Sequence, residues 1–180
     1  MLHRTQVIQV VPIYQKFIAR YPNVSALVNS DQQELRNMLY PLGLKWRVAL
    51  INQMAQEIAD RFDMQVPMDK GSLLSLPGVS QYIAGAVLCF AWNFPEPVID
   101  TNTIRIAGRV FGLETKDSSR RNSKFRNLIT LMVDPENPRA YNYALLDLAH
   151  LVCLKKHEPL CQECPIKIYC QYAKQRSPNG

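Results

Sequence analysis

The chain has 180 residues, of which 47% are hydrophobic and 20% are charged. This composition excludes disorder as the main state, and the length leaves room for one domain or two small lobes. The 21 Lys and Arg against 15 Asp and Glu give a net charge of +6, which favours a polyanionic partner without identifying it.

Apolar residues recur at helical spacing along nearly the whole chain, and no alternating strand pattern with a hairpin turn is found. The sequence therefore predicts an all-α fold. The predicted helices, in chain order, cover residues 5–20, 31–40, 45–61, 70–75, 80–92, 101–110, 123–133 and 138–152, followed by a short turn near 166–175.

The longest stretch without an ionised side chain, residues 71–95, raises the alternative of a membrane span. Pro77 and Gly78 interrupt it early, and the apolar run that remains, 80–92, is too short to cross a bilayer. We therefore expect a buried helix here and no membrane partner. The first five residues have no targeting pattern, so a cytoplasmic location is expected.

Residues 73–88 combine two short helical patterns with a Pro-Gly turn between them. Small Ala84 and Gly85 permit close packing, and the start of the second helix exposes backbone N–H groups that attract phosphate. The spacing is typical of a helix-hairpin-helix motif, although Ser80 stands where a second Gly is usual. An ordinary tight turn between packed helices is the alternative.

Asp100 stands directly before the predicted helix 101–110, where an Asp is more often an N-cap than a catalyst. Its position shortly after the hairpin favours the catalytic interpretation, because a carboxylate beside the phosphates of a duplex is electrostatically costly. An acid kept there indicates a cationic centre that it stabilises. Asn102 is expected to assist Asp100, with a helix cap as its alternative role.

Four of the five cysteines lie within eighteen residues, at Cys153, Cys161, Cys164 and Cys170. In a reducing compartment such crowding indicates a metal more often than disulfides. Four thiolates fit either structural Zn²⁺ or a [4Fe–4S] cluster. The uneven spacing, with seven, two and five residues between successive cysteines, favours the cluster.

The three motifs in this order resemble the helix-hairpin-helix DNA glycosylases of the endonuclease III superfamily, over residues 2–170. The resemblance implies two helical lobes with DNA in a cleft between them, residues 1–94 with the hairpin and residues 95–180 with the cluster loop. It implies that Asp100 is the catalytic carboxylate. It also implies that Cys153, Cys161, Cys164 and Cys170 hold a [4Fe–4S] cluster, although the first gap is one residue longer than usual.

The same resemblance implies which residues contact double-stranded DNA. His3 and Arg4 match a loop that enters the minor groove, with a solvated helix end as the alternative. The hairpin grips the DNA backbone, and the cluster loop presents basic side chains to it. The predicted DNA contacts beyond the first loop are Leu76, Gly78, Val79, Ser80, Gln81, Lys155 and Lys156.

Tyr82 occupies the place where bifunctional members of this family, which also cut the strand, have a Lys. A phenol forms no Schiff base with the sugar, so Tyr82 closes that route. Tyr82 with Asp100 and Asn102 resembles the mismatch thymine glycosylases. The adenine glycosylases share the Asp-x-Asn pattern but usually have Ser at the Tyr82 position.

The sequence therefore predicts a monofunctional DNA glycosylase of base excision repair that acts as a monomer. The expected substrate is thymine or uracil opposite guanine, and adenine opposite guanine or 8-oxoguanine is the alternative. A non-catalytic DNA-binding module is kept as a third possibility, because the family's upstream acidic residue is not found before Leu2.

Overall fold

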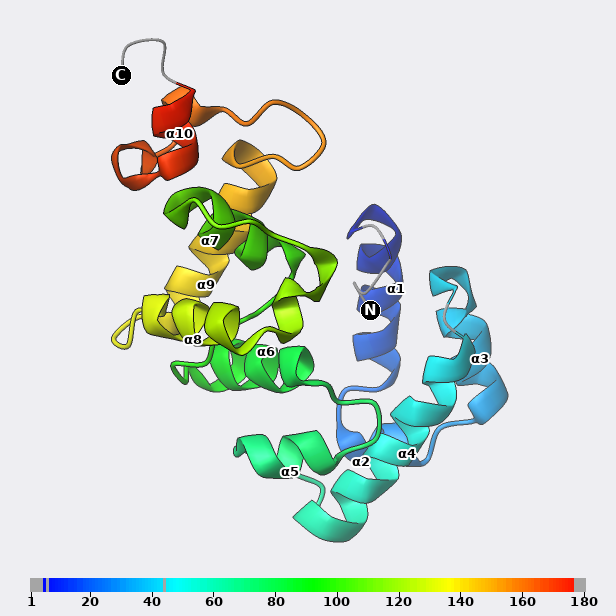
Figure 1. The fold of residues 1–180 in the computed structure, drawn as a ribbon. Helices are drawn as coiled ribbons and strands as arrows, with labels where there is room; N and C mark the ends of the chain where they lie inside the picture. Colours follow the sequence, from blue (N-terminus) through cyan, green and yellow to red (C-terminus); the bar gives the residue numbers. More distant parts are fainter. Residues whose placement is uncertain (1–4, 6, 44, 177–180) are drawn as a thin grey trace. The chain divides into compact units, whose positions relative to one another are not determined.

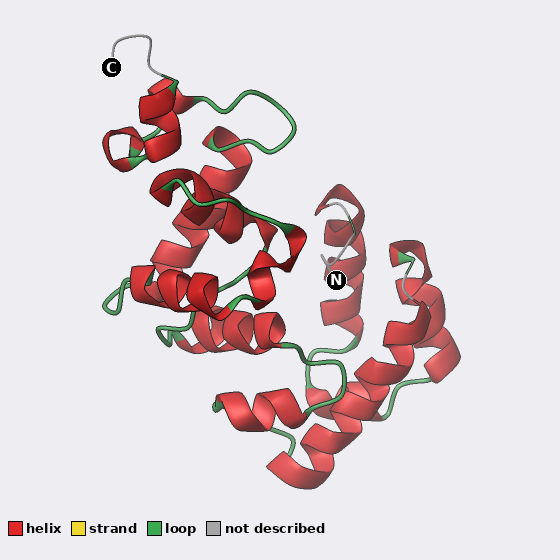
Figure 2. Cartoon of the chain, in the orientation of Figure 1, coloured by secondary structure: helices red, strands yellow, loops and turns green. Residues whose placement is uncertain are grey.

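The structure is a computed structural model that describes residues 5, 7–43 and 45–176. Within these ranges every regular element is a helix and no strand is formed (Figures 1 and 2). The predicted all-α class is therefore confirmed. Among the described helices, none is both long and apolar enough to cross a membrane.

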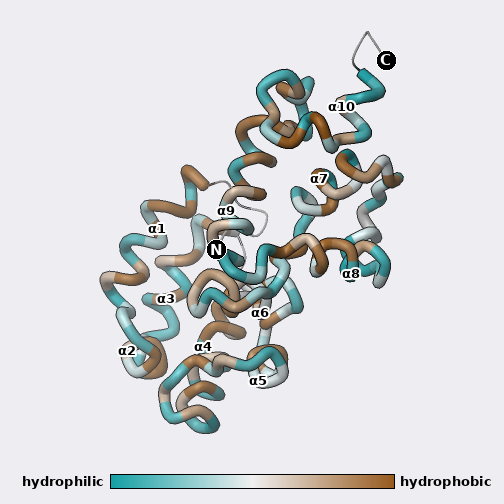
Figure 3. The backbone as a smooth tube through the Cα atoms, turned by 90° about the vertical axis from the view of Figure 1, so that its left-hand side faces the viewer, coloured by the Kyte–Doolittle hydropathy of each residue, from teal (hydrophilic) through white to brown (hydrophobic). Residues whose placement is uncertain are grey.

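The chain divides into two compact units, residues 1–80 and 81–180. The first unit contains α1 (Val7–Arg20), α2 (Val24–Val28), α3 (Gln32–Leu39), the short 3₁₀ helix η1 (Tyr40–Leu42), α4 (Lys45–Phe62) and α5 (Lys70–Ser75). Apolar and polar stretches alternate along these helices (Figure 3), as expected for helices with one face on a core. That core consists of Val10, Tyr21, Leu35, Leu39, Leu42 and Val48.

Side-chain caps start three helices of the first unit. Asn23, Asp31 and Asp69 each accept a hydrogen bond from a backbone N–H in the first turn of α2, α3 and α5. The helix α2 was not predicted, because its five residues are too few to show an apolar period.

The second unit is built around α7 (Thr101–Phe111), which packs against α8 (Ser123–Met132), α9 (Pro138–Asp147) and α10 (Gln171–Gln175). It begins with α6 (Gln81–Trp92). One side of α7 packs with Ile129, and the other packs with Leu145 and Ala149. The remaining elements are short: η2 (Asp117–Arg121), η3 (Leu148–Val152), η4 (Cys161–Glu163) and η5 (Lys167–Tyr169).

Two boundaries differ from the sequence-based expectation. Residues 138–152 were predicted as one α-helix, but the last turn, η3, is a π-helix in which the Cys153 N–H donates to the Leu148 carbonyl at 2.7 Å. The expected first lobe ended at residue 94, whereas α6 packs against α9 and so belongs to the second unit. The proposed lobes and the cleft between them stay predictions.

Candidate active site

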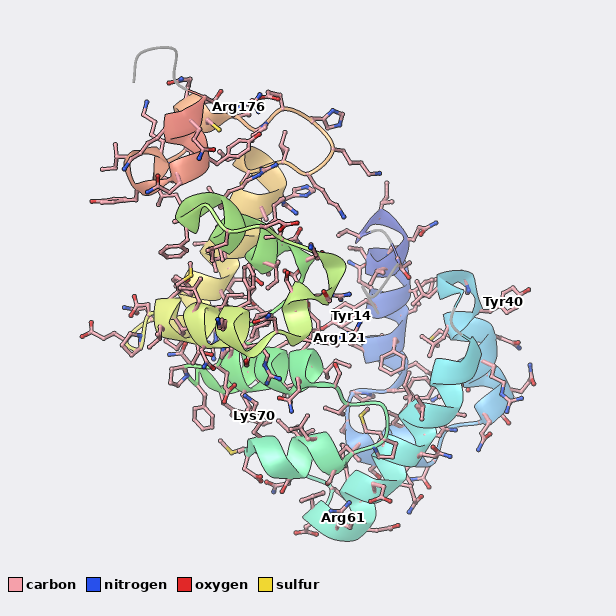
Figure 4. All side chains as sticks on the ribbon, in the orientation of Figure 1. Tyr14, Tyr40, Arg61, Lys70, Arg121 and Arg176 are labelled. Carbon is pink, nitrogen blue, oxygen red and sulfur yellow. The ribbon has the colours of Figure 1, made fainter. Side chains whose placement is uncertain are left out.

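The predicted hairpin is a tight turn between α5 and α6. Gly78 has a φ of +78°, and a Cβ added there would lie 3.1 Å from Leu50 Cδ1 of α4. Glycine therefore suits both the backbone conformation and the close approach. The Val79 N–H closes the turn on the Leu76 carbonyl at 3.2 Å, and Arg61, labelled in Figure 4, donates from Nη2 to Ser75 Oγ at 3.1 Å.

The hairpin residues differ in what they offer to a ligand. Leu76 is buried, with 3% of its surface exposed, so its side chain serves packing and only its backbone can contact DNA. Gly78, Ser80 and Gln81 are exposed, and Val79 is half-buried. The helix α6 begins at Gln81, and the first N–H groups of a helix have no partner within it. Their contact with DNA stays a prediction.

A second glycine brings the chain before Asp100 against α6. A Cβ on Gly85 would lie 2.8 Å from the Pro97 carbonyl oxygen, closer than real Cβ contacts, so only glycine allows this approach. Asn142 of α9 holds the same segment: its Oδ1 accepts from the Val98 N–H at 3.2 Å, and its Nδ2 donates to the Glu96 carbonyl at 3.3 Å. Because Asn142 is almost fully buried, these bonds fix the segment that leads to Asp100.

Asp100 is the N-cap of α7, and both oxygens of its carboxylate accept hydrogen bonds. Oδ1 accepts from the backbone N–H groups of Asn102 at 2.7 Å and Thr103 at 2.8 Å. Oδ2 accepts from Asn102 Nδ2 at 2.8 Å. The backbone N–H of Asp100 donates in turn to Thr103 Oγ1 at 2.9 Å, which completes a capping box. The half-buried carboxylate is therefore held in one orientation.

Tyr82 lies within electrostatic reach of Asp100. The pKa of the Tyr82 phenol is raised above its ordinary value, first by burial and then by the negative charge of Asp100. Tyr82 keeps 39% of its surface exposed. With its pKa raised, the phenol stays protonated at neutral pH. The structure thus brings together Tyr82, Asp100 and Asn102, the three residues that the sequence analysis named as catalytic candidates.

Arg105 orients the Asn102 amide, a role that the sequence analysis missed. Its Nη1 donates to Asn102 Oδ1 at 3.0 Å, so the Asn102 amide nitrogen faces Asp100. The other two contacts run to the π-helical turn and its end, from Nη2 to the Ala149 carbonyl at 2.9 Å and from Nε to the Cys153 carbonyl at 3.0 Å. The spacing of three residues between Asn102 and Arg105 on a predicted helix is the signal that could have revealed this pair.

The four cysteines of the C-terminal loop carry free thiols. In the described part of the chain, no three His, Cys, Asp or Glu side chains are close enough to hold a single metal ion. The pKa of the Cys161 thiol is nevertheless raised, first by burial and then by the charges of Cys170, Cys153 and Cys164. The charges of these three cysteines therefore reach the Cys161 sulfur, although the four side chains are not gathered into a site for one metal ion.

Arg109 contacts two of these cysteines. Its Nη1 donates to Cys153 Sγ at 3.1 Å and to the Leu154 carbonyl at 2.9 Å, and the Cys170 thiol donates to the Arg109 carbonyl at 3.4 Å. Helix α7 thus holds the ends of the cysteine loop as well as Asp100.

The remaining predicted DNA contacts are in two places. Lys155 and Lys156 are exposed in the turn that follows Cys153, where they are available to a ligand. His3 and Arg4 lie outside the described residues. No observation tests these four contacts, and they stay predictions.

A family model described as HhH-GPD superfamily base excision DNA repair protein matches residues 1–130. The chain belongs to this superfamily. It is 38% identical over 176 residues to the thymine-DNA glycosylase of Aeropyrum pernix, and this match covers 96% of this chain and 78% of that protein. This relationship confirms the resemblance on which the sequence analysis relied.

Two further comparisons support the same assignment. The chain is 31% identical over 175 residues to an adenine DNA glycosylase of Buchnera aphidicola, a match that covers 95% of this chain but only 48% of that protein. A solved structure of a thermostable thymine-DNA glycosylase matches with a TM-score of 0.85 and 25% identity, over 97% of this chain and 80% of that one. This HhH-GPD protein is therefore a DNA glycosylase of base excision repair.

Proposed function

We propose that this protein hydrolyses the N-glycosidic bond of thymine or uracil mispaired with guanine and leaves the DNA strand intact. The observation that carries the proposal is Tyr82, whose phenol lies within electrostatic reach of Asp100 and offers no amine to the sugar. The 38% identity to a thymine-DNA glycosylase supports thymine as the base. Uracil lacks only the methyl group of thymine, so a site that accepts thymine has room for it.

Asp100 supplies the charge that the reaction needs. Breaking the N-glycosidic bond builds positive charge on the deoxyribose, and a nearby carboxylate stabilises it. Because the hydrogen bonds from Asn102 and Thr103 already fix both carboxylate oxygens, Asp100 does not have to reorient when the charge develops. The same carboxylate can orient the attacking water.

The base must leave the stack before its glycosidic bond becomes accessible, and a mispaired base costs less to extrude. The exposed residues Gly78, Ser80 and Gln81, at the turn and the start of α6, are suited to contact the phosphates of the strand during this step. In this scheme the hairpin positions the strand, and Asp100 acts on the sugar.

Tyr82 determines the product. A lyase needs an unprotonated amine at the sugar's C1′, and the protonated phenol of Tyr82 offers none. The product is therefore an abasic site in an uncut strand.

The four cysteines fit a [4Fe–4S] cluster better than a zinc ion. The uneven spacing of Cys153, Cys161, Cys164 and Cys170, with seven, two and five residues between them, favours the cluster, because zinc modules usually pair two Cys-x2-Cys knuckles. When bound, such a cluster supplies a rigid crosslink within a loop that has little core of its own. We infer that it shapes the turn bearing Lys155 and Lys156.

Adenine opposite guanine or 8-oxoguanine is the second candidate substrate, because the chain is 31% identical to an adenine DNA glycosylase. Tyr82 favours the thymine assignment over this one. Double-stranded DNA is the partner in both cases, and we expect the protein to act as a monomer in the cytoplasm.

The test is incubation of purified protein with duplexes that carry one G·T, G·U, A·G or A·8-oxoguanine pair, followed by alkali. We expect cleavage of the thymine and uracil strands after alkali and none of the adenine strands. Cleavage of the adenine strands alone would contradict the substrate assignment, and no cleavage of any duplex would favour the non-catalytic module.

A further inference from the structure

A cavity of about 240 Å³ lies in the second unit, next to the candidate active site. We call it the basic cavity, because four of its lining residues are cations. Its polar lining consists of Thr101, Arg105, Thr115, Lys116, Arg120 and Lys155. No Asp or Glu side chain that the structure describes lines it. The cavity adjoins the Asp100 site: Thr101 directly follows Asp100 in the chain, and Arg105 donates to Asn102 Oδ1.

Two of the four cations, Arg105 and Lys116, have no strong acidic partner among the contacts of the described residues. Arg105 donates three hydrogen bonds, and all three acceptors are neutral oxygens of the protein. Lys116 pairs with Glu114 at 3.3 Å, but the two side chains are 70% and 79% exposed, and such surface pairs contribute little. An incoming anion can therefore replace Glu114. Concave sites lined by one sign of charge concentrate ions of the opposite sign.

The cavity joins segments that are far apart in the sequence. Arg105 belongs to α7, and Lys116 and Arg120 belong to the loop and 3₁₀ helix that follow, where Arg121 is labelled in Figure 4. Lys155 comes from the turn after Cys153. Of these residues, the sequence analysis assigned only Lys155 to DNA, and it could not bring the other three to the same place.

We propose that the basic cavity binds a backbone phosphate of the DNA strand that carries the target base. The proposal rests on the proposed function, and it adds a phosphate site separate from the hairpin. At about 30 Å³ per water, the cavity has room for roughly eight waters, enough for a phosphodiester group and part of its hydration. The hydroxyls of Thr101 and Thr115 complete a set of donors suited to phosphate oxygens.

The position of the cavity determines which phosphate it takes. The sugar of the target nucleotide must lie at Asp100, and each sugar of a strand is flanked by a phosphate on either side. A cavity that begins at Thr101 therefore reaches a phosphate within one or two nucleotides of the target. Holding this phosphate keeps the extruded sugar in place against the carboxylate.

The experiment measures binding of G·T duplexes in which one phosphate near the target is replaced by a neutral methylphosphonate. The variant K116A/R120A removes two cations of the cavity without touching Asp100, Asn102 or Tyr82. The matched control, K16A/K174A, removes two exposed cations that do not line the cavity. Thermal unfolding of both variants checks that they fold.

We expect one methylphosphonate position, one or two nucleotides from the target, to weaken binding by the wild-type protein and by the control. In the K116A/R120A variant the same replacement has no further effect. The slope of log K against log salt concentration becomes shallower by about 0.9 for the lost phosphate contact. The control variant keeps the wild-type slope unless Lys16 or Lys174 itself contacts the duplex, and it keeps the methylphosphonate sensitivity in either case.

The proposal is overturned if no single position weakens wild-type binding, or if the folded K116A/R120A variant keeps the wild-type sensitivity to it. Because the readout is binding, it separates this proposal from the proposed function. If the protein excises no base but the K116A/R120A variant loses this phosphate contact, the phosphate site stands and the proposed function fails. If the protein excises thymine but the contact is not found, the proposed function stands and this proposal fails.

Discussion

Replacing Asp100 by Asn separates the catalytic role of this side chain from its role as a helix cap. Asn is as good an N-cap as Asp, and its Oδ1 can accept the same backbone N–H groups of Asn102 and Thr103. Its amide nitrogen, however, then faces Asn102 Nδ2, so two donors meet where a hydrogen bond existed. The loss of that bond lowers the free energy of unfolding by about 1 kcal/mol.

The expected effect on the reaction is much larger. The neutral amide cannot stabilise positive charge on the sugar, so single-turnover excision from a G·T duplex falls by about 100-fold or more, which corresponds to about 2.7 kcal/mol of the barrier. Duplex affinity stays within a few-fold of wild type. Asp31→Asn, the same change at the N-cap of α3, is the control and keeps the wild-type rate. A D100N protein that excises at the wild-type rate would refute the reasoning.

Three further changes test the arrangement around Asp100. Arg105→Leu leaves two carbonyl oxygens without their donor, which lowers the free energy of unfolding by about 1–3 kcal/mol each, and it also frees the Asn102 amide. The excision rate should therefore fall by more than the loss of stability explains. An equal fall in excision rate for Arg109→Leu, which spares Asn102, would contradict this. Gly85→Ala forces its Cβ against the Pro97 carbonyl and should lower the free energy of unfolding by about 1–3 kcal/mol, measured by urea denaturation; unchanged stability would show that the segment yields. Anaerobically purified protein should be brown with about four iron atoms per chain, and Cys164→Ser should reduce the folded yield; stoichiometric zinc without iron would exclude the cluster.

The sequence predicted the elements whose signals are local. The spacing of apolar residues predicted the long helices, and α5 begins and ends where the pattern placed it. Asp100 is both a cap and a candidate catalyst, so the two interpretations of one residue are compatible. The short helix α2 was not predicted, because it depends on the cap Asn23 rather than on a periodic pattern.

The contacts that complete the site join distant parts of the sequence and leave no local pattern. Asn142 is a single polar residue in a predicted helix, yet it fixes the segment before Asp100 from 44 residues away. Arg105 reaches across a similar interval to Cys153. The π-helical turn before Cys153 likewise depends on tertiary hydrogen bonds, which an apolar period does not encode.

The central claim, base excision without strand cutting, is tested most directly by one measurement on a labelled G·T duplex. Wild-type protein is incubated with the duplex in the presence of borohydride, and the products are separated before and after treatment with alkali. We predict an intact strand before alkali, a cleaved strand after it, and no protein–DNA adduct, because Tyr82 provides no amine to the sugar. Efficient trapping together with cleavage before alkali would contradict the account and would mean that another amine reaches the sugar.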